Sequence, residues 1–311
     1  MGNIAVIGAG MMGPGIAQVF AAHGHTVHIH NRTSAKLDLV HEKVRTNLQQ
    51  MAPYGLADAS QITAVLERIV TTTDLATACK DADVVIETIT ESLPLKQELF
   101  VELDRLCPPP AILCSNTSVI SITQIGEHCA HRERILGMHF YQPPFLVPLV
   151  EVVRTELVDT KYMDAIMDLL RACGKEPVRV QKDVPGFIAN RMQHALWREA
   201  FSLIDEGVCD AETVDIAVRN SFGLRLPVLG PVTNADLVGL DLTLAIHDYV
   251  LTHLNASPRP STTLRDHVEK GELGFKTKNG FLHWTDESMA ATREQLTKHL
   301  LTMLSRKNTA Q

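Results

Sequence analysis

A glycine-rich turn near the start of the chain constrains its fold more than any other feature. Gly8, Gly10 and Gly13 form a G-x-G-x-x-G pattern that follows the apolar stretch 3–7 and precedes an apolar stretch with helical spacing. A second β-prone stretch at 27–30 completes a unit of the length that a parallel strand–helix–strand crossover requires. A strand, this turn and a helix in succession are typical of the loop that binds the pyrophosphate of a dinucleotide.

Each glycine has a distinct purpose in such a loop. Gly8 makes the tight turn, Gly10 lets the backbone approach the phosphates, and Gly13 allows the helix to pack closely on the strand. The helix then presents free N–H groups and the positive end of its dipole to the phosphates. Met11 and Met12 lie between the glycines and are predicted to line the same site. An ordinary glycine turn is the alternative, and the strand–turn–helix context argues against it.

The rest of the first half alternates between short apolar runs and amphipathic segments. Strands are predicted at 69–72, 83–88, 111–115, 135–140 and 149–153, and helices at 16–23, 34–66 with a break near Pro53, and 93–106. This alternation predicts a doubly wound, mostly parallel sheet of the Rossmann type, an α/β fold.

The pattern changes near residue 183, where Asp183-Val-Pro-Gly-Phe is predicted to be a linker and the entry to a helix. Helices are predicted at 188–206, 211–222, 235–254 and 286–305, with no further buried strand. We therefore expect a dinucleotide-binding domain over 1–183 and an all-helical C-terminal domain, for substrate binding and dimerisation, over 184–311.

The composition argues against several classes of partner. The formal net charge is −7, which gives no reason to expect binding to nucleic acid or to an anionic membrane. No apolar stretch approaches the length of a membrane span, and the first apolar run lacks the basic segment of a signal peptide.

The six cysteines contain no C-x-x-C pair, which indicates reduced thiols in a cytoplasmic protein.

Four histidines lie on the second predicted strand or just before it, at His23, His25, His28 and His30. Alternating histidines can bind a metal ion, but no cysteine or carboxylate cluster joins these four. We therefore expect no metal site.

The end of the second strand bears on which dinucleotide is bound. Proteins that bind NAD in this way usually have Asp or Glu there, whereas this chain has Asn31-Arg32-Thr33. An amide, a guanidinium and a hydroxyl group suit the 2′-phosphate of NADP, which a carboxylate would repel. The sequence thus favours NADP over NAD. The alternative is that Asn31 binds the NAD ribose while Arg32 stacks on the adenine.

Four motifs resemble those of the L-3-hydroxyacyl-CoA dehydrogenase family, in family order and spacing. They are Ser115-Asn-Thr-Ser118, Met138-His139-Phe-Tyr-Gln-Pro-Pro144, Pro148-Leu-Val-Glu151-Val and Pro185-Gly-Phe-Ile-Ala-Asn190-Arg191. The resemblance runs over nearly the whole chain, from the glycine loop through Glu87 and Glu91 to Lys276-Thr277 and Gly280-Phe281. It implies an enzyme that transfers hydride between NAD(P) and a small-molecule substrate.

The resemblance also implies the roles of individual residues. His139 is expected to be the general acid/base paired with Glu151, and Ser118 and Asn190 to bind the substrate oxygen. Glu91, Lys96, Gln142 and Lys276 fall at positions that line the cofactor site. Imidazole exchanges protons near neutral pH, and a carboxylate on its second nitrogen fixes the tautomer.

Each of these residues has a structural alternative. His139 could be an ordinary core residue, Ser118 could cap a helix, and Glu91 and Lys96 could be an exposed acid and base. Four motifs in register favour the functional interpretation, most clearly for His139 and Glu151.

The sequence departs from the family at three places. Gln142 replaces the family's Asn, and the stretch 34–66 is shorter and offers few cations, Lys36, Lys43 and Arg45, for the phosphates of CoA. The loop after Phe222 contains Arg225, which could pair with a substrate carboxylate or be an exposed arginine with a solvated head. The form of this loop resembles that of relatives that act on small hydroxy acids, such as the lambda-crystallin-like gulonate dehydrogenases and pyridine-carboxylate dehydrogenases.

We therefore expect an oxidoreductase for the 3-hydroxy or 3-oxo group of a small hydroxy acid or hydroxyacyl-CoA, with the small acid modestly favoured. The alternatives are a genuine 3-hydroxyacyl-CoA dehydrogenase that uses NAD, and a non-catalytic, crystallin-like protein that binds a dinucleotide. The resemblance also implies a homodimer.

Overall fold

The computed structural model describes residues 2–309. The chain forms two compact units, Met1–Arg191 with Leu296–Gln311, and Met192–Gln295. The first unit contains the glycine loop and all four catalytic candidates.

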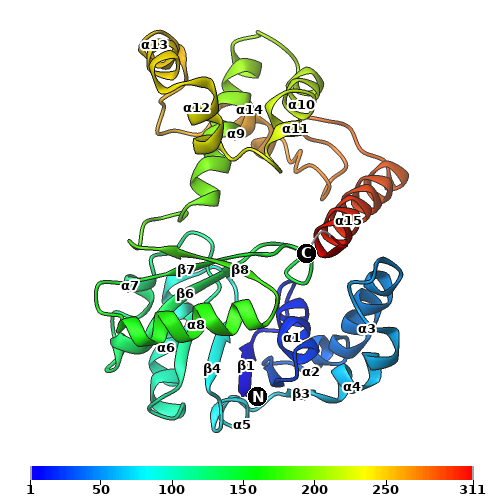
Figure 1. Ribbon diagram of the computed structural model, residues 1–311, viewed down its shortest axis with the longest axis vertical. Helices are drawn as coiled ribbons and strands as arrows, with labels where there is room; N and C mark the ends of the chain where they lie inside the picture. The colour runs from blue at the N-terminus through cyan, green and yellow to red at the C-terminus, as the bar shows by residue number, and fades with distance from the viewer. Residues whose placement is uncertain (1, 310–311) are drawn as a thin grey trace. The chain divides into compact units, whose positions relative to one another are not determined.

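The first unit is built on one eight-stranded sheet in the order β3-β2-β1-β4-β5-β6-β7-β8 (Figure 1). Neighbouring strands are parallel except for β6 and β7, which are antiparallel. The strands are β1 (Asn3–Ile7), β2 (Thr26–His30), β3 (Ile69–Thr72), β4 (Val84–Glu87), β5 (Ile112–Ser115), β6 (Ile135–Phe140), β7 (Leu149–Val153) and β8 (Glu176–Val180). The predicted Rossmann-type sheet is confirmed.

Helices cover both faces of this sheet because its strands are apolar on both sides. One core joins the sheet to α1 (Gly13–Ala22), α3 (Val40–Met51), α4 (Ile62–Glu67) and α8 (Thr160–Ala172). The other joins it to α5 (Leu75–Cys79), α6 (Leu93–Leu106) and α7 (Ile122–Ile125). The remaining short elements of this unit are α2 (Ser34–Leu37), η1 (Ala52–Tyr54), η2 (Ala59–Gln61) and η3 (Arg132–Arg134).

The second unit is helical, as predicted. Its elements are most of α9 (Ala189–Asp205), then α10 (Ala211–Arg219), α11 (Phe222–Arg225), α12 (Pro231–Val238), α13 (Leu240–Val250), η4 (Leu251–His253), α14 (Thr262–Glu269) and the start of α15 (Asp286–Thr309). Within it Phe201 stacks on Phe281, with ring centroids 4.8 Å apart. Asp205 accepts hydrogen bonds from the backbone N–H groups of Thr262 and Thr263, at the start of α14.

The structure differs from the sequence prediction at several elements. Strand β8 was not predicted, because its sequence Glu-Pro-Val-Arg-Val alternates charged and apolar residues and contains a proline. It lies at the edge of the sheet, where a proline is tolerated. Helices α5 and α8 were also not predicted, although Asp74 and Asp159 cap their N-termini.

Two predicted helices of the second unit are each divided. The helix predicted over 235–254 was wrong in its continuity, since Gly239, at φ 103°, separates α12 from α13. The segment 211–222 likewise ends as α10 at Arg219, and a short helix, α11, begins at Phe222. Similarly, the predicted segment 34–66 consists of several short helices separated by turns.

Residues 2–309 contain no helix that is both long enough and apolar enough to span a membrane. In the same range, no three histidine, cysteine or acidic side chains come together as a metal site would require. The six cysteines are free, and five of them are buried.

Candidate active site

Strand pairing brings His139 and Glu151 together. They are directly opposite each other in the antiparallel pair formed by β6 and β7. The Nδ1 atom of His139 lies 2.9 Å from Oε2 of Glu151, and both side chains are buried. Because a carboxylate only accepts hydrogen bonds, Nδ1 carries the proton and Nε2 is left as the basic nitrogen. This is the arrangement that a general base needs.

Glu151 is held by three further donors. Its Oε2 also accepts a hydrogen bond of 2.8 Å from the Tyr141 hydroxyl group. Its Oε1 accepts one of 2.9 Å from each of the backbone N–H groups of Ile188 and Ala189. Burial by itself would raise the pKa of Glu151, but the hydrogen bond from His139 and these three donors together lower it. The carboxylate is therefore charged at neutral pH.

The chain before Ile188 has an unusual backbone conformation. Phe187 is buried and has a φ of 49°, in the left-handed region that a bulky residue rarely occupies. Its ring lies 5.7 Å from the ring of His139. Such a conformation costs of order 1–3 kcal/mol and persists only where the surrounding contacts enforce it. Here it directs the next two N–H groups at Glu151.

Ser118 and Asn190 also lie in the first unit, and a hydrogen bond joins them. The side-chain amide of Asn190, in the first turn of α9, donates to the backbone carbonyl oxygen of Ser118 at 3.2 Å. Ser118 lies in the loop after β5 and does not cap a helix, since Ser121 caps α7. Ser118 thus follows β5, the neighbour of β6, and Asn190 lies at the start of α9, whose first N–H group donates to Glu151 on β7.

A buried ionic network supports the loop that contains Ser118. The Lys96 ammonium group lies 2.6 Å from Glu87 and 3.3 Å from Glu91. Glu91 in turn accepts hydrogen bonds from the Thr117 hydroxyl group and from the backbone N–H of Ser118. Burial would raise the pKa of Glu91, but the Thr117 hydroxyl and the Lys96 charge outweigh it, so that the pKa is lowered.

Glu87 forms the base of this network. It is fully buried at the end of β4, and it accepts a hydrogen bond of 2.6 Å from Ser115 on the neighbouring strand. Lys96 is 1% exposed and does not line the cavity described below, whereas Glu91 does. Lys96 therefore holds Glu91 in position from the protein interior, without itself reaching the cavity.

A cavity of about 800 Å³ lies over the glycine loop. The predicted residues that line it are Gly8, Gly10, Met11, Met12, Asn31, Arg32, Glu91 and Ser118. A Cβ atom added at Gly10 would meet nothing within 4 Å, so this glycine leaves an open approach to the backbone. The N-terminus of α1 adjoins this space, which fits the phosphates of a dinucleotide.

Gly8 and Gly13 are required by the turn itself. Gly8 has a φ of 124°, and a Cβ atom there would lie 2.6 Å from the carbonyl oxygen of Thr88. A Cβ atom at Gly13 would overlap the carbonyl oxygen of Gly8. Gly13 therefore does not line the cavity but allows the helix to start directly beside the turn.

Asn31 connects the end of β2 to the glycine loop. Its amide nitrogen donates to the backbone carbonyl oxygen and the hydroxyl group of Thr33, at 3.0 and 3.1 Å. Its oxygen accepts from the backbone N–H of Ala9 at 3.4 Å. The Asn31 amide is thus already bonded within the protein. Thr33 does not line the cavity. The basic side chains Arg32 and Lys36 do line it, at the end near Asn31.

The three other predicted residues are Gln142, in the first unit, and Lys276 and Arg225, in the second. Gln142 is exposed after β6 and does not line the cavity over the glycine loop. Lys276 and Arg225 belong to the second unit, where both side chains are exposed.

Three further residues of the candidate site, Tyr141, Asn116 and Glu87, were not predicted from the sequence. Asn116 lines the cavity, and its side-chain oxygen accepts a hydrogen bond from the backbone N–H of Phe140. A carboxylate at the end of an apolar strand was the available signal for Glu87. Tyr141 lay within a quoted motif, but its contact with Glu151 depends on strand register.

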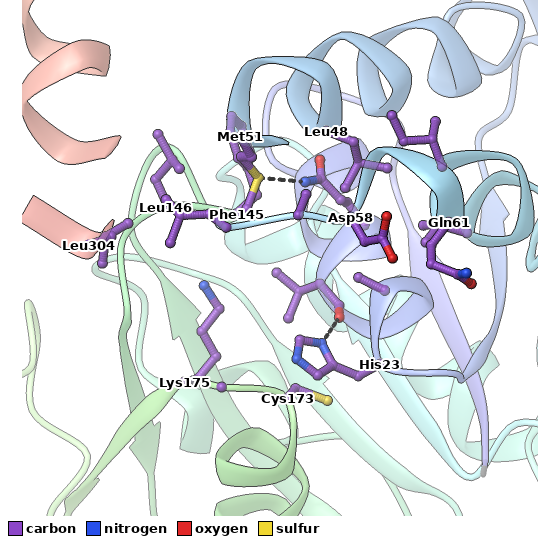
Figure 2. Close-up of a pocket in the computed structure, with 18 of the residues that line it drawn as sticks. His23, Leu48, Met51, Asp58, Gln61, Phe145, Leu146, Cys173, Lys175 and Leu304 are labelled. Carbon is purple, nitrogen blue, oxygen red and sulfur yellow. Dashed lines mark hydrogen bonds between the residues drawn. The ribbon is translucent and has the colours of Figure 1, made fainter. Parts of the chain in front are cut away.

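A second cavity, of about 430 Å³, lies between α1, the α3–α4 region and the start of β8 (Figure 2). Lys175 extends into this region, and burial lowers its pKa to about 8. Its ammonium group donates to the carbonyl oxygens of Pro144 and Val147, at 2.5 and 3.0 Å. Lys175 thus holds the connection between β6 and β7, which contain His139 and Glu151.

Family models match almost all of the chain. The NAD binding domain of 3-hydroxyacyl-CoA dehydrogenase matches residues 3–184, and the C-terminal domain of the same family matches residues 186–284.

Individual relatives agree over similar lengths. The chain is 31% identical to a 5-formyl-3-hydroxy-2-methylpyridine 4-carboxylate 5-dehydrogenase of Mesorhizobium japonicum, over 96% of each chain. It is 35% identical to the mitochondrial hydroxyacyl-coenzyme A dehydrogenase of Homo sapiens, over 90% of each chain.

Solved structures give the same result. A crystal structure of the first kind of enzyme, described as an NAD+ dependent dismutase, has a TM-score of 0.91 at 31% identity and 97% coverage of both chains. An (S)-3-hydroxybutyryl-CoA dehydrogenase from Ralstonia eutropha has a TM-score of 0.76 at 32% identity, with 91% of this chain and 99% of that chain covered. The chain belongs to the 3-hydroxyacyl-CoA dehydrogenase family.

Proposed function

We propose that the protein is a dehydrogenase that interconverts a hydroxyl and an oxo group of a small carboxylic acid. The observation on which this depends is the buried pair of His139 and Glu151, 2.9 Å apart, in a unit with a dinucleotide-sized cavity. NAD would be held by the glycine loop and by Glu91, and when bound it accepts or supplies the hydride.

His139 moves the proton in this reaction. When an alcohol is oxidised, Nε2 takes the hydroxyl proton, and when a ketone is reduced the same atom returns it. Glu151 keeps the proton of Nδ1 in place and stabilises the positive charge that the ring acquires. The low pKa of Glu151 supports this role, because a neutral carboxyl group would not stabilise that charge.

We propose that Ser118 and Asn190 orient the substrate oxygen. The Ser118 hydroxyl group is the proposed donor to this oxygen, and the Asn190 amide fixes the Ser118 backbone. Donors that are already in position stabilise the charge that develops on oxygen during reduction. The Glu91–Thr117 contact keeps the loop of Ser118 fixed.

The assignment of His139 and Glu151 is tested by substitution. We expect His139→Ala and Glu151→Gln to lower kcat by two to four orders of magnitude while NAD binding, measured by calorimetry, survives. Exposed His128→Ala is a matched control that should leave turnover unchanged. Near-normal turnover in either active-site variant would refute the assignment.

The substrate is proposed to be a small acid rather than a CoA thioester. The support is the greater structural similarity to the pyridine-carboxylate enzyme, with a TM-score of 0.91, than to the hydroxybutyryl-CoA enzyme, with 0.76. The scarcity of cations in 34–66 and the presence of Arg225 agree with it. Acetoacetyl-CoA should be compared with a panel of small hydroxy and oxo acids; efficient turnover of the CoA ester alone would overturn the preference.

The cofactor is proposed to be NAD or NADP, with the NADP preference still a prediction. Arg32 and Lys36 line the cavity and favour a 2′-phosphate, while Asp74, Glu98 and Glu102 line it too and oppose one. The name of the family domain and of the dismutase relative favours NAD. The ratio of kcat/KM for the two cofactors decides, and a clear advantage of NAD would end the NADP hypothesis.

A non-catalytic dinucleotide-binding role is not favoured. A purely structural protein has no reason to bury a histidine–carboxylate pair with four donors on the carboxylate. An assay of cofactor absorbance distinguishes the two roles. We further propose a homodimer and a cytoplasmic location.

A further inference from the structure

The hydroxyl group of Tyr141 contacts the proposed catalytic pair without belonging to it. Tyr141 directly follows β6 and is half-buried. Its ring centroid lies 4.4 Å from that of His139, and its hydroxyl oxygen lies 2.8 Å from Oε2 of Glu151. The same side chain therefore packs on the imidazole and hydrogen-bonds its partner.

Tyr141 and His139 compete for one oxygen atom. His139 Nδ1 donates to Oε2 of Glu151 at 2.9 Å, and the Tyr141 hydroxyl donates to that atom at 2.8 Å. The other oxygen, Oε1, already accepts from the N–H groups of Ile188 and Ala189. Each donor withdraws part of the negative charge of the carboxylate, so the bond to His139 is weaker than it would be without the phenol.

We propose that Tyr141 is a positioning residue that sets the strength of the Glu151–His139 hydrogen bond, and thereby the pH range in which His139 acts as a base. The proposal depends on the proposed role of this pair. Tyr141 itself need not touch the substrate or the cofactor.

Besides His139, the donors to Glu151 are the Tyr141 side chain and two backbone N–H groups, and of these a substitution can remove only the Tyr141 donor. The groups that face Glu151 are His139 on β6, Tyr141 after β6, and the backbone N–H groups of Ile188 and Ala189 before and at the start of α9. Within residues 2–309, no lysine or arginine forms an ion pair with Glu151. Burial and then the Glu151 hydrogen bond raise the pKa of Tyr141, so the phenol is a proton donor throughout the working pH range.

The first test is the pH dependence of alcohol oxidation by Tyr141→Phe. The phenylalanine keeps the ring on His139 and removes only the donor. With one competitor gone, Glu151 holds the protonated imidazole more strongly, and the base form appears at higher pH. We expect the acidic limb of kcat/KM to move up by about 0.5–1 pH unit, with the plateau within about threefold of wild type.

The second test needs no turnover. The proton between His139 and Glu151 should give a low-field ¹H NMR resonance that is absent in His139→Ala. In Tyr141→Phe this resonance should move further downfield, because the remaining hydrogen bond is shorter and stronger. Tyr54→Phe, in η1, is the matched control and should change neither readout.

The two readouts separate the inference from the proposed function. If His139→Ala retains turnover, the proposed function fails. The resonance of wild type compared with that of Tyr141→Phe still reports on the Tyr141 hydrogen bond. An unchanged acidic limb and an unchanged resonance in Tyr141→Phe would overturn the inference. A loss of kcat by orders of magnitude without a shift in pH would overturn it as well, since it would indicate direct contact of Tyr141 with the substrate.

Discussion

The charged side chains buried in the first unit each have several hydrogen-bond partners. Glu151 accepts four hydrogen bonds, and Lys96 lies between the carboxylates of Glu87 and Glu91. A buried charge without a partner costs several kcal/mol, so such groups stay charged only where donors and acceptors are fixed in advance. Pre-positioned charge is also what an active site requires, and at these residues stability and proposed function depend on the same contacts.

Glu87→Gln tests the buried network directly. The substitution keeps the shape but leaves the Lys96 ammonium group with only Glu91 as a charged partner. We expect a loss of about 3–5 kcal/mol in the free energy of unfolding, measured with urea, as for other broken buried pairs. NAD binding should also weaken, because Glu91 and the loop of Ser118 lose their support. Exposed Glu127→Gln is the control, and equal stability of the two variants would contradict the network.

Asp104 gives a prediction about acid stability. Its carboxylate accepts hydrogen bonds from Arg134 at 2.7 Å and from the backbone N–H of Ala130 at 2.8 Å, and both charged side chains are buried. Burial would raise its pKa, but the Arg134 hydrogen bond and the backbone donors lower it. A lowered pKa in the folded state stabilises the protein above the unfolded value of about 3.9, and this is lost as pH falls through the folded value.

We therefore expect Asp104→Asn to cost about 3–5 kcal/mol at pH 7. The difference between variant and wild type should shrink as the pH is lowered below about 4. Urea unfolding at a series of pH values measures both effects. A difference that is independent of pH would show that the charge of Asp104 is not the cause.

Residue identity alone suggested the members of the candidate site, whereas their contacts depend on the fold. His139 and Glu151 stand out in the sequence because a histidine and a carboxylate interrupt apolar strands. Their pairing depends on the register of β6 against β7, where a slip of one residue would turn the side chains to opposite faces. The sequence does not state this register, and for that reason the Tyr141 contact could not be predicted.

At the scale of elements, strands buried on both faces were the most predictable. Runs such as Val84–Glu87 contain four buried residues in succession. Where such short runs alternate with amphipathic segments along the chain, they indicate strands of a sheet that is covered on both faces. The edge strand β8 could not be recognised, since only Val180 is buried and its residues are polar and apolar in turn. Breaks in helices were equally hidden, because a single glycine such as Gly239 can lie inside a helix or end it.

The glycine loop yields a prediction about an element rather than a side chain. Gly13→Ala should destabilise the protein by about 1–3 kcal/mol, since its Cβ atom would overlap the Gly8 carbonyl oxygen at the start of α1. Gly10→Ala should fold normally, since its Cβ atom meets nothing within 4 Å. It should nevertheless weaken NAD binding about tenfold or more, because that open space is where the phosphates approach the backbone.

Thermal unfolding and calorimetric NAD titration of both variants check this pair. Gly230→Ala, at another position with open space around the Cβ atom, is the control. If Gly10→Ala binds NAD like wild type, the dinucleotide does not approach the loop at this point. If Gly13→Ala is as stable as wild type, the turn tolerates a side chain that its geometry excludes.

At the scale of the whole molecule, the two units differ in how well they cover their apolar residues. The first unit buries most of its large apolar side chains in two cores on the sheet faces. The second unit exposes many, among them Leu237, Leu240, Leu244 and Tyr249, each more than 60% exposed. Leu240 and Leu244 lie one turn apart on α13, so they form part of one apolar surface. Monomeric proteins rarely leave large contiguous apolar surfaces in water.

A second copy of the chain is the proposed partner for this surface, in line with the homodimer that the resemblance implies. We expect wild type to have twice the monomer mass of 34.3 kDa by light scattering after gel filtration. Leu240→Asp combined with Leu244→Asp should shift the mass to that of the monomer, because burying two carboxylates in an apolar interface costs more than the interface returns. Exposed Leu157→Asp, in the first unit, should leave the dimer intact. A monomeric wild type, or a double variant that stays dimeric, would show that α13 does not form the interface.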